Sequence, residues 1–433
     1  MKKAVVFILA LSVLFCTGCS FIAGITEIMQ PPKLTEEQDK IYNALISRVG
    51  ESINLKYPRS GDYRSAFVLY DIDNDEQDEA LVFYENTSAA AAENSVKMDV
   101  LDSMDDVWKS VCSYEFEATD IDIINFLINE DKTETSIVVG YLTGLSEKRA
   151  QVLKYQGEQG LLSAYQTQYT SLNFTDVDFD INNELLVFYN NAVSEVSTLT
   201  ILKDIDGSFT EKGTVSMEPS TTEIVNVKRE RTKNGALLYI DTLKTTNLLA
   251  TELIQVENTI RNLNYNDSVN NISETQRTSG IYSMDIDDDG KIEIPASSVL
   301  PGYEAMNKED QLNAIQWMNY DNGKMTRRYY SYYNLSDGYV FTYPERWLGQ
   351  VTVRIDEATN EAVFCKYEGN SIDKMTELMR IKSITSGREE IPDVDYQYIS
   401  THEKKEYYVK LSSDINESLV LTVTEVNFNL HSF

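Results

Sequence analysis

Histidine and cysteine are scarce in this chain of 433 residues, and their scarcity argues against several kinds of chemistry. The sequence has two histidines, His402 and His431, and four cysteines. It contains no H-E-x-x-H zinc motif, no G-x-S-x-G motif, no phosphate-binding glycine loop and no Cys–His nucleophile pattern. A zinc centre and a disulfide framework are therefore not expected. We predict no catalytic residues and a protein that is not an enzyme.

Basic residues are also few. The chain has 38 lysines and arginines against 69 aspartates and glutamates, which gives a formal net charge of −31. A surface this acidic repels the phosphates of nucleic acids and of anionic lipids. We therefore expect no nucleic-acid partner, and we favour divalent cations, basic proteins or cationic polymers.

Many of the acids are collected in three short segments. Each fits D-x-D-x-D-x-x-x-[DE], and we call them the first, second and third acidic loops: DIDNDEQDE at 71–79, DVDFDINNE at 176–184 and DIDDDGKIE at 285–293. Carboxylates held so close repel one another by about 1 kcal/mol per pair in water, and by more where the dielectric falls. Calcium removes this repulsion because it accepts about six to eight oxygens, from side chains at alternate positions and a backbone carbonyl.

The pattern therefore predicts up to three calcium ions, with solvated acidic turns as the alternative, because Asp and Asn favour turns for their own backbone chemistry. The carbonyl ligands are expected midway between the third Asp and the Glu. The predicted ligands are Asp71, Asp73, Asp75, Gln77 and Glu79 in the first loop, Asp176, Asp178, Asp180, Asn182 and Glu184 in the second, and Asp285, Asp287, Asp289, Lys291 and Glu293 in the third.

The acidic loops are part of a longer repeat. The first and second loops lie 105 positions apart, and at that offset ALVFYEN aligns with LLVFYNN. The third loop follows after another 109 positions and leads into a short IEIP. Each loop therefore runs into an apolar strand, which indicates a repeated structural unit.

Short strands separated by Asn, Asp, Gly and Ser turns fill residues 55–333. Half of the 105-residue offset is about 50 residues, the size of one four-stranded propeller blade. We predict a mainly β protein with a propeller-like array of about five blades that start near residues 67, 118, 172, 222 and 280. A sandwich is the alternative.

The acidic loops with their following strands resemble FG-GAP and VCBS repeats, the calcium-binding blades of integrin α-subunits and of many secreted bacterial proteins. The segment from KLTEEQDK to VLYDIDNDEQDEALVFYEN also resembles uncharacterised bacterial VCBS-repeat lipoproteins. The family places Gly after the third Asp, where the loop turns sharply, and here only Gly290 satisfies this, with Glu76 and Ile181 at the equivalent positions. A β-branched residue is costly at positive φ. We therefore rank the third loop first, the first loop second and the second loop last.

The N-terminus indicates export. Lys2 and Lys3 precede an apolar run that is too short for a comfortable membrane span. FCTGCS resembles a bacterial lipobox, with Cys16 where Leu is usual. The resemblance implies a lipoprotein signal peptide over 1–19, a lipid-modified (diacylglycerol, palmitate) Cys19 as first mature residue, and an extracytoplasmic protein anchored to the membrane. An ordinary secretion signal is the alternative.

Two regions flank the predicted blades. A tether over 20–34 leads to a helix over 35–54, which Thr35 and Gln38 cap and Gly50 ends. Residues 334–433 are expected to form a separate C-terminal α/β domain, or alternatively further blades. Cys112 and Cys365 are the remaining cysteines, and we expect two buried free thiols.

The tyrosine-rich segment YYSYY at 329–333 alternates its rings between two faces. One reading is a platform for sugars or cations, and the other is a strand that packs half of its rings. The function that best fits all these features is a calcium-binding, membrane-anchored module for a protein or glycan ligand. A secreted, carboxylate-dependent glycan hydrolase and a structural envelope-assembly factor are the alternatives.

Overall fold

The computed structural model describes residues 34–87, 95–129, 134–144, 147–205, 208–266, 268–321, 323–369, 375–387, 393–412 and 418–432. Cys19 and the predicted signal peptide lie outside these residues. The chain divides into two compact units, which are taken here one at a time. The first comprises Met1–Ile123 with Tyr155–Leu162, and the second Ile124–Lys154 with Ser163–Phe433. None of the helices in the described residues is long and apolar enough to cross a membrane.

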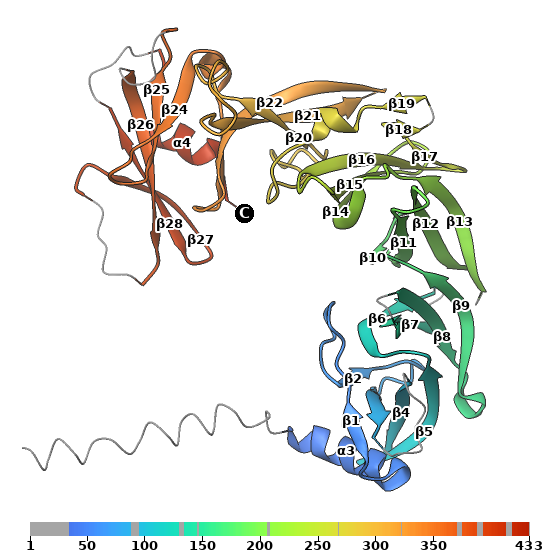
Figure 1. Cartoon of the computed structure of the whole chain (residues 1–433). Coiled ribbons are helices and arrows are strands. Elements are labelled where there is room, and N and C mark those ends of the chain that lie inside the picture. The colour runs from blue at the N-terminus through green and yellow to red at the C-terminus, as the bar shows by residue number, and fades with distance from the viewer. Residues whose placement is uncertain are drawn as a thin grey trace, which may run out of the picture. The chain divides into compact units, whose positions relative to one another are not determined.

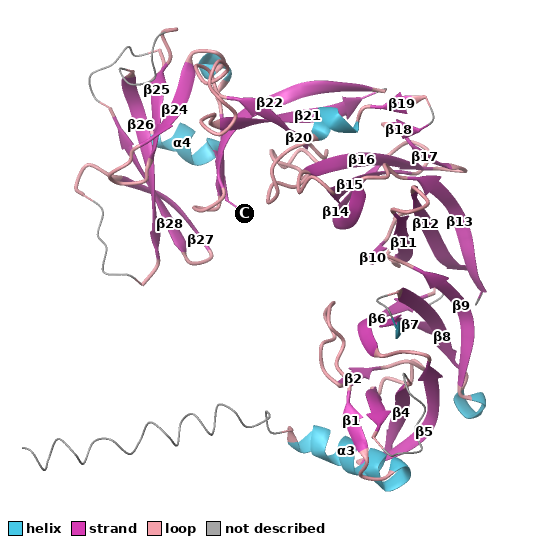
Figure 2. Ribbon diagram, viewed as in Figure 1, coloured by secondary structure: helices cyan, strands magenta, loops and turns pink. Residues whose placement is uncertain are grey.

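The prediction of a mainly β protein is confirmed. Antiparallel strands dominate, and the described residues contain two α-helices, α3 and α4 (Figure 2). Helix α3 spans Glu36–Val49 and begins after Thr35, whose hydroxyl accepts from the Gln38 amide while the Gln38 side chain accepts from the Thr35 amide. It ends at Gly50, which has a φ of 85°. The predicted capping box and stop are therefore formed.

The first unit contains one sheet with the strand order β1-β3-β4-β5, in which β2 also pairs with β3. Its core joins Ile41 and Leu45 of α3 to Ala80 and Val82 of the sheet. The strands are β1 (Ile53–Leu55), β2 (Phe67–Tyr70), β3 (Glu79–Asn86), β4 (Val96–Met104) and β5 (Val107–Phe116).

Three four-stranded sheets follow, each with its strands in chain order (Figure 1). The division between the two units cuts the outer strands β6 and β9. The three sheets comprise β6 (Asp120–Ile128), β7 (Thr135–Leu142), β8 (Lys148–Tyr155) and β9 (Leu161–Gln168), with a 3₁₀ turn at Gly157–Gln159; β10 (Ser171–Thr175), β11 (Glu184–Asn191), β12 (Val196–Ile205) and β13 (Ser208–Ser216); and β14 (Thr221–Arg231), β15 (Ala236–Lys244), β16 (Leu249–Val256) and β17 (Ile260–Asn262).

The C-terminal part of the second unit contains two five-stranded sheets, with the orders β20-β21-β22-β23-β29 and β24-β25-β26-β28-β27. A two-stranded ribbon, β18-β19, and two 3₁₀ turns precede or join them. The elements are β18 (Tyr265–Asn266), β19 (Val269–Asn270), a 3₁₀ turn at Ile272–Thr275, β20 (Ile294–Val299), β21 (Asn313–Asp321), β22 (Lys324–Asn334), β23 (Tyr339–Thr342), a 3₁₀ turn at Glu345–Trp347, β24 (Val351–Ile355), β25 (Ala362–Lys366), β26 (Thr376–Thr385), β27 (Gln397–His402), β28 (Lys405–Leu411), α4 (Val423–Asn429) and β29 (Leu430–Ser432).

Four strands begin close to four of the predicted blade starts: β2, which pairs with β3, and the first strands of the three four-stranded sheets. Residues 67, 118, 172 and 222 were expected, and β2, β6, β10 and β14 begin at Phe67, Asp120, Ser171 and Thr221. The fifth expected start, near 280, precedes the third acidic loop and β20. A further sheet, β24–β28, lies beyond these five.

The apolar strands are buried on both faces, which explains their continuous hydrophobic runs. In β11, Leu185 and Val187 belong to a core shared with β7 and β8, whereas Leu186 and Phe188 belong to a core shared with β15 and β16. The sheet β10–β13 thus packs between the sheet that precedes it and the sheet that follows it in the chain.

The region around residue 334, where the sequence suggests a boundary, lies inside a sheet. Strand β22 ends at Asn334 and pairs with β23, which in turn pairs with the C-terminal β29. One core joins Tyr332 and Phe341 of this sheet to Phe364 of the next. Both described cysteines are free thiols, Cys365 buried and Cys112 half-buried.

Candidate metal sites in three acidic loops

The three acidic loops have one backbone conformation. The fourth residue of each loop has positive φ, at 63° for Asn74, 65° for Phe179 and 57° for Asp288. The sixth residue also has positive φ, at 73° for Glu76, 85° for Ile181 and 87° for Gly290. The sharp turn predicted after the third Asp is therefore present in all three loops, including the two that lack glycine.

The same four hydrogen bonds also recur in each loop. In the first loop, the amides of Asp75 and Glu76 donate to the two oxygens of Asp71 at 3.2 and 3.1 Å, and the Gln77 amide donates to Asp75 at 2.8 Å. The Ile72 amide donates to Glu79 Oε2 at 2.8 Å, which ties the loop to the start of β3. The equivalent bonds of the second and third loops lie between 2.6 and 3.1 Å.

These bonds turn the carboxylates of each loop toward one centre. One oxygen from each member of a trio lies within 4.8 Å of the others in every loop. The trios are Asp71, Asp73 and Glu79; Asp176, Asp178 and Glu184; and Asp285, Asp287 and Asp289. The structure thus gathers nine of the predicted side-chain ligands, and leaves Asp75, Asp180 and Glu293 outside the trios.

The first loop has an incomplete set of partners. Glu79 is 1% exposed, and its Oε1 has no hydrogen-bond partner. Burial raises the pKa of Glu79 to about 7, and the charges of Asp73, Asp102 and Asp75 act in the same direction. No lysine or arginine in the described part of the chain forms an ion pair with this loop. A buried, unpartnered carboxylate oxygen among other carboxylates fits a hard cation.

The second loop already holds a cation from its own chain. Lys203 Nζ of β12 lies 2.7 Å from Asp178 Oδ2, 2.7 Å from Asp180 Oδ2 and 3.7 Å from Glu184 Oε1. Lys203 is 12% exposed, so the ammonium group sits among the carboxylates with little access to water.

Further cations neutralise the rest of the second loop. Arg229 Nη1 lies 2.6 Å from Asp176 Oδ2, and Lys212 Nζ lies 3.4 Å from Asp178 Oδ2. The guanidinium groups of Arg229 and Arg231 also lie over the Phe179 ring, 4.6 and 4.2 Å from its centroid. This loop therefore forms a local ion-pair network.

The third loop is intermediate between the other two. Tyr329 donates a hydrogen bond to Asp287 Oδ2 at 2.5 Å, and the exposed Arg328 lies 3.4 Å from the same oxygen. Burial raises the pKa of Glu293, and both of its oxygens have partners: Oε2 accepts from Ile286 and Oε1 from Asn319 Nδ2 at 2.7 Å. The oxygen-only donor set fits a hard cation, and the buried Asp287 Oδ1 has no hydrogen-bond partner. The difference from the first loop is that both oxygens of the terminal Glu293 have partners, whereas Glu79 Oε1 has none.

Sequence reasoning missed Lys203, Asn319 and Tyr329, because these residues reach the loops from strands that are distant in the sequence. A lysine in the interior of the apolar strand 196–205 was the visible signal for Lys203. Tyr329 was noted as a possible sugar platform, but its hydroxyl contacts Asp287. Tyr330 and Tyr332 of the same strand are buried in the core.

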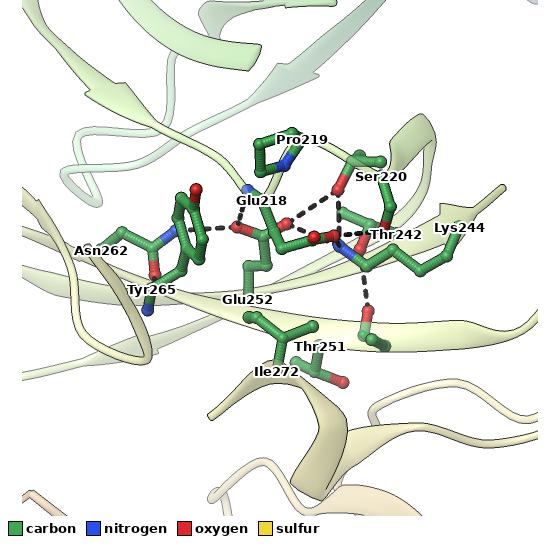
Figure 3. A network of polar contacts seen from close by, with 12 residues as sticks. Glu218, Pro219, Ser220, Thr242, Lys244, Thr251, Glu252, Asn262, Tyr265 and Ile272 are labelled. Carbon is green, nitrogen blue, oxygen red and sulfur yellow. Dashed lines mark hydrogen bonds and ion pairs between the residues drawn. The ribbon is translucent and has the colours of Figure 1, made fainter. Parts of the chain in front are cut away.

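A second polar cluster lies on β14–β16 and the segment before β14, with Lys244 and Glu252 buried and Glu218 partly buried (Figure 3). Lys244 Nζ lies 2.9 Å from Glu252 Oε1 and 3.2 Å from Glu218 Oε2. Glu252 Oε2 accepts from Asn262 Nδ2 at 2.8 Å and from the Glu218 amide at 3.1 Å. The cluster ties β17 and the segment before β14 to β15 and β16.

A cavity of about 530 Å³ opens beside this cluster, lined by Ser197, Met217, Pro219 and Asn262 among others. The Asn262 side chain faces it with its polar atoms already used. Nδ2 donates to Glu252 and to the Ser216 carbonyl, and Oδ1 accepts from the amides of Asn264 and Tyr265. The cluster therefore serves as a scaffold, and the acidic loops remain the candidate site.

Comparisons with known proteins place this chain in no family. No family model matches it, and no curated protein matches it. Among solved structures, the periplasmic gluconolactonase PpgL of Pseudomonas aeruginosa is similar to it at 11% identity and a TM-score of 0.27, over 74% of this chain and 86% of that chain. That protein is an enzyme, which corrects our expectation of a non-enzymatic protein. A likeness this slight assigns no reaction and no substrate to this chain.

Removing the charge of Lys244 should destabilise the protein strongly. Lys244→Met leaves the buried Glu252 and the partly buried Glu218 without their cation, and we expect a loss of about 3–5 kcal/mol in the free energy of unfolding. Urea denaturation measures it. Lys366→Met, which breaks an exposed pair with Glu368, is the matched control and should cost at most about 1 kcal/mol. Equal effects of the two changes would contradict the scaffold role.

Glycine at position 181 should stabilise the second loop. Ile181 is 82% exposed and has a φ of 85°, a conformation that costs a β-branched residue about 1–2 kcal/mol. Ile181→Gly removes this strain and no packing, so we expect a small gain in melting temperature. The reverse change, Gly290→Ala, should lower it, although a Cβ there meets nothing within 4 Å. A loss on Ile181→Gly would show that the strain is absent.

The calcium-free protein should lose stability as the pH rises from about 4.5 to about 7. The folded Glu79 and Glu184 both have a pKa of about 7, against an ordinary value of 4.5, so the folded state holds protons that the unfolded state has released. Urea unfolding in EDTA at pH 5 and pH 8 measures the difference, and Glu79→Gln should reduce it.

Glu85→Gln is the control for this pH dependence. A hydrogen bond from Lys56 holds the pKa of Glu85 below its ordinary value, so its removal should leave the slope between pH 5 and pH 8 unchanged. If Glu79→Gln leaves the change in unfolding free energy between pH 5 and pH 8 unaltered, Glu79 is not the source of the pH dependence.

Proposed function

We propose that this chain is an extracytoplasmic, membrane-anchored lipoprotein whose β-sheets act as calcium-binding blades of the FG-GAP or VCBS kind and present a binding surface to a protein or glycan. The anchor would be a lipid on Cys19. The single observation that carries the calcium part is Glu79 Oε1, a buried carboxylate oxygen without a partner in a loop that gathers Asp71 and Asp73.

The donor chemistry supports calcium over a transition metal. The three acidic loops offer carboxylate and carbonyl oxygens, and neither histidine of the chain belongs to them. Oxygen ligands in a flexible loop suit a hard cation such as Ca²⁺. In the first loop the ligands would be Asp71, Asp73 and Glu79 with the Gln77 carbonyl. In the third they would be Asp285, Asp287 and Asp289 with the Lys291 carbonyl.

The order of affinity that we propose places the first loop above the third. The third loop has the favourable Gly290 and an unpartnered Asp287 Oδ1, but Tyr329 already bonds Asp287 Oδ2 and Asn319 bonds Glu293 Oε1. The first loop has backbone strain at Glu76, where φ is positive, but its Glu79 Oε1 lacks a hydrogen-bond partner. A cation stabilises a loop with an unpartnered buried carboxylate oxygen by more free energy than a glycine stabilises the turn.

Bound calcium would act on this protein by neutralising charge and fixing loops. The first loop joins β2 to β3 and the second joins β10 to β11, while the third is closed by an isolated β-bridge between Met284 and Glu293. A cation held there would remove repulsion at the end of the sheet and order the turn. Extracellular calcium is abundant enough to fill modules whose Kd is about 10⁻⁴–10⁻³ M.

Calcium should raise the melting temperature, and EDTA should reverse the effect. One ion at 100 times its Kd stabilises the folded state by about 2.7 kcal/mol. Differential scanning calorimetry of the purified chain in calcium and in EDTA measures the shift. Asp73→Asn and Asp287→Asn should each reduce it, because each removes one charge and keeps an oxygen in place.

Asp356→Asn is a suitable control for these two changes, because Asp356 lies in an exposed turn that pairs with Arg380 outside the acidic loops. It should leave the calcium shift intact. An identical melting temperature in calcium and EDTA would refute the metal part of the proposal.

A further inference from the structure

The three acidic loops differ at one equivalent position on a neighbouring strand. The residue that follows the terminal Glu of each loop has a Cα partner on the next strand: Ala80 with Leu101, Leu185 with Leu202, and Ile294 with Met318. The next residue after each partner is Asp102, Lys203 and Asn319, respectively. Strand register therefore makes these three residues equivalent, although no constant sequence spacing connects them to their loops.

Two of these residues contact the terminal Glu of their loop: Lys203 Nζ lies 3.7 Å from Glu184 Oε1, and Asn319 Nδ2 donates to Glu293 Oε1 at 2.7 Å. In the first loop the position holds Asp102, whose ionised carboxylate has no donor to offer, and Glu79 Oε1 has no partner. The Oε1 atom of the terminal Glu therefore lies near an ammonium group in the second loop, accepts from a side-chain amide in the third loop, and has no partner in the first loop.

We propose that this position selects the occupant of each acidic loop, and that the Lys203 ammonium is the built-in cation of the second loop, where it takes the place of a divalent ion. Asp102 adds a negative charge and gives the first loop the highest affinity for a cation. Asn319 is neutral and gives the third loop an intermediate affinity. The part that concerns the first and third loops rests on the proposed calcium binding. The part that concerns Lys203 does not.

Geometry and charge distinguish Lys203 from an ordinary ion pair. Its Nζ reaches Asp178 and Asp180, two alternate side chains of one loop, at 2.7 Å each, and Glu184 besides. Alternate side chains and the terminal Glu are the groups that would surround a calcium ion. A monovalent ammonium leaves the loop short of charge, and Arg229 and Lys212 supply it from outside. A divalent ion would meet these positive charges as well as Lys203.

The test exchanges the selecting residue between loops. Lys203→Asn places the residue of the third loop in the second, and Asp102→Lys places the residue of the second loop in the first. Native mass spectrometry and isothermal titration of the purified chain measure the number of bound calcium ions. The melting temperature is measured in calcium and in EDTA. The Lys203→Asn variant should bind one more calcium ion than the wild type. Its melting temperature should be below that of the wild type in EDTA and should return to the wild-type value in calcium. Asp102→Lys should lose one ion.

Two controls locate the gained ion and separate it from general effects. Adding Asp178→Asn to Lys203→Asn should abolish the gain, because it removes a ligand of the second loop. Lys212→Met, which removes a lysine 3.4 Å from Asp178 but outside the selecting position, should gain no ion. Lys244→Met should lower stability, gain no ion, and keep the same melting-temperature shift in calcium as the wild type.

The outcomes separate this inference from the proposed function. A wild type that binds no calcium, with a Lys203→Asn variant that binds one, would refute calcium binding in the first and third loops and support the role of Lys203. A wild type whose stoichiometry falls on Asp178→Asn would show that the second loop already holds an ion and overturn the inference. A folded Lys203→Asn variant with no gain would overturn it too. If Lys203→Asn fails to fold, Asp102→Lys still decides, since unchanged stoichiometry there contradicts the selecting role.

Discussion

Electrostatic repulsion among gathered carboxylates is the constraint on which the acidic loops depend. Each loop turns so that the amides of its fifth and sixth residues bind its first aspartate and the amide of its second residue binds its glutamate. This backbone conformation brings carboxylate oxygens of each loop within 4.8 Å of one another. The gathered carboxylates therefore need positive charge nearby to offset their repulsion, either from side chains of the protein or from ions in the solvent.

The three loops meet this demand in different ways although their backbones agree. The second loop is neutralised by Lys203, Lys212 and Arg229. The third loop uses hydrogen bonds from Tyr329 and Asn319 to two of its carboxylates. The first loop has neither, and its buried Glu79 is left with an oxygen without a partner. Side chains from adjacent strands therefore decide the chemistry, while the loop sequence decides the shape.

This division explains how far the sequence could predict the structure. The loop pattern is local, so the turn after the third Asp, with positive φ at Glu76 and Ile181, could be predicted from the family position of Gly290. The capping box of α3 is local for the same reason. Strands that begin near four of the expected blade starts also followed from the repeat, and the three four-stranded sheets are meanders with their strands in chain order.

What the sequence could not provide was the register between strands. Lys203 lies 19 residues after Glu184, whereas Asn319 lies 26 residues after Glu293, so no fixed spacing identifies them as equivalent. Only the pairing of β11 with β12 and of β20 with β21 aligns them. The C-terminal boundary near 334 depends on pairing as well, because β29 returns from the end of the chain to join β23. Such contacts are non-local and carry no sequence motif.

A lysine and a calcium ion are not equivalent solutions to the same repulsion. The ion brings two charges and accepts about six to eight oxygens, but it is present only when the surroundings supply it. The lysine brings one charge with fixed geometry, and it is always present. Under the proposed calcium binding, a sheet whose loop is closed by Lys203 would keep its order without calcium, whereas a sheet whose loop contains the unpartnered Glu79 oxygen would gain order when calcium binds. A chain that combines both kinds of loop would then respond to calcium in some sheets and remain folded in the others.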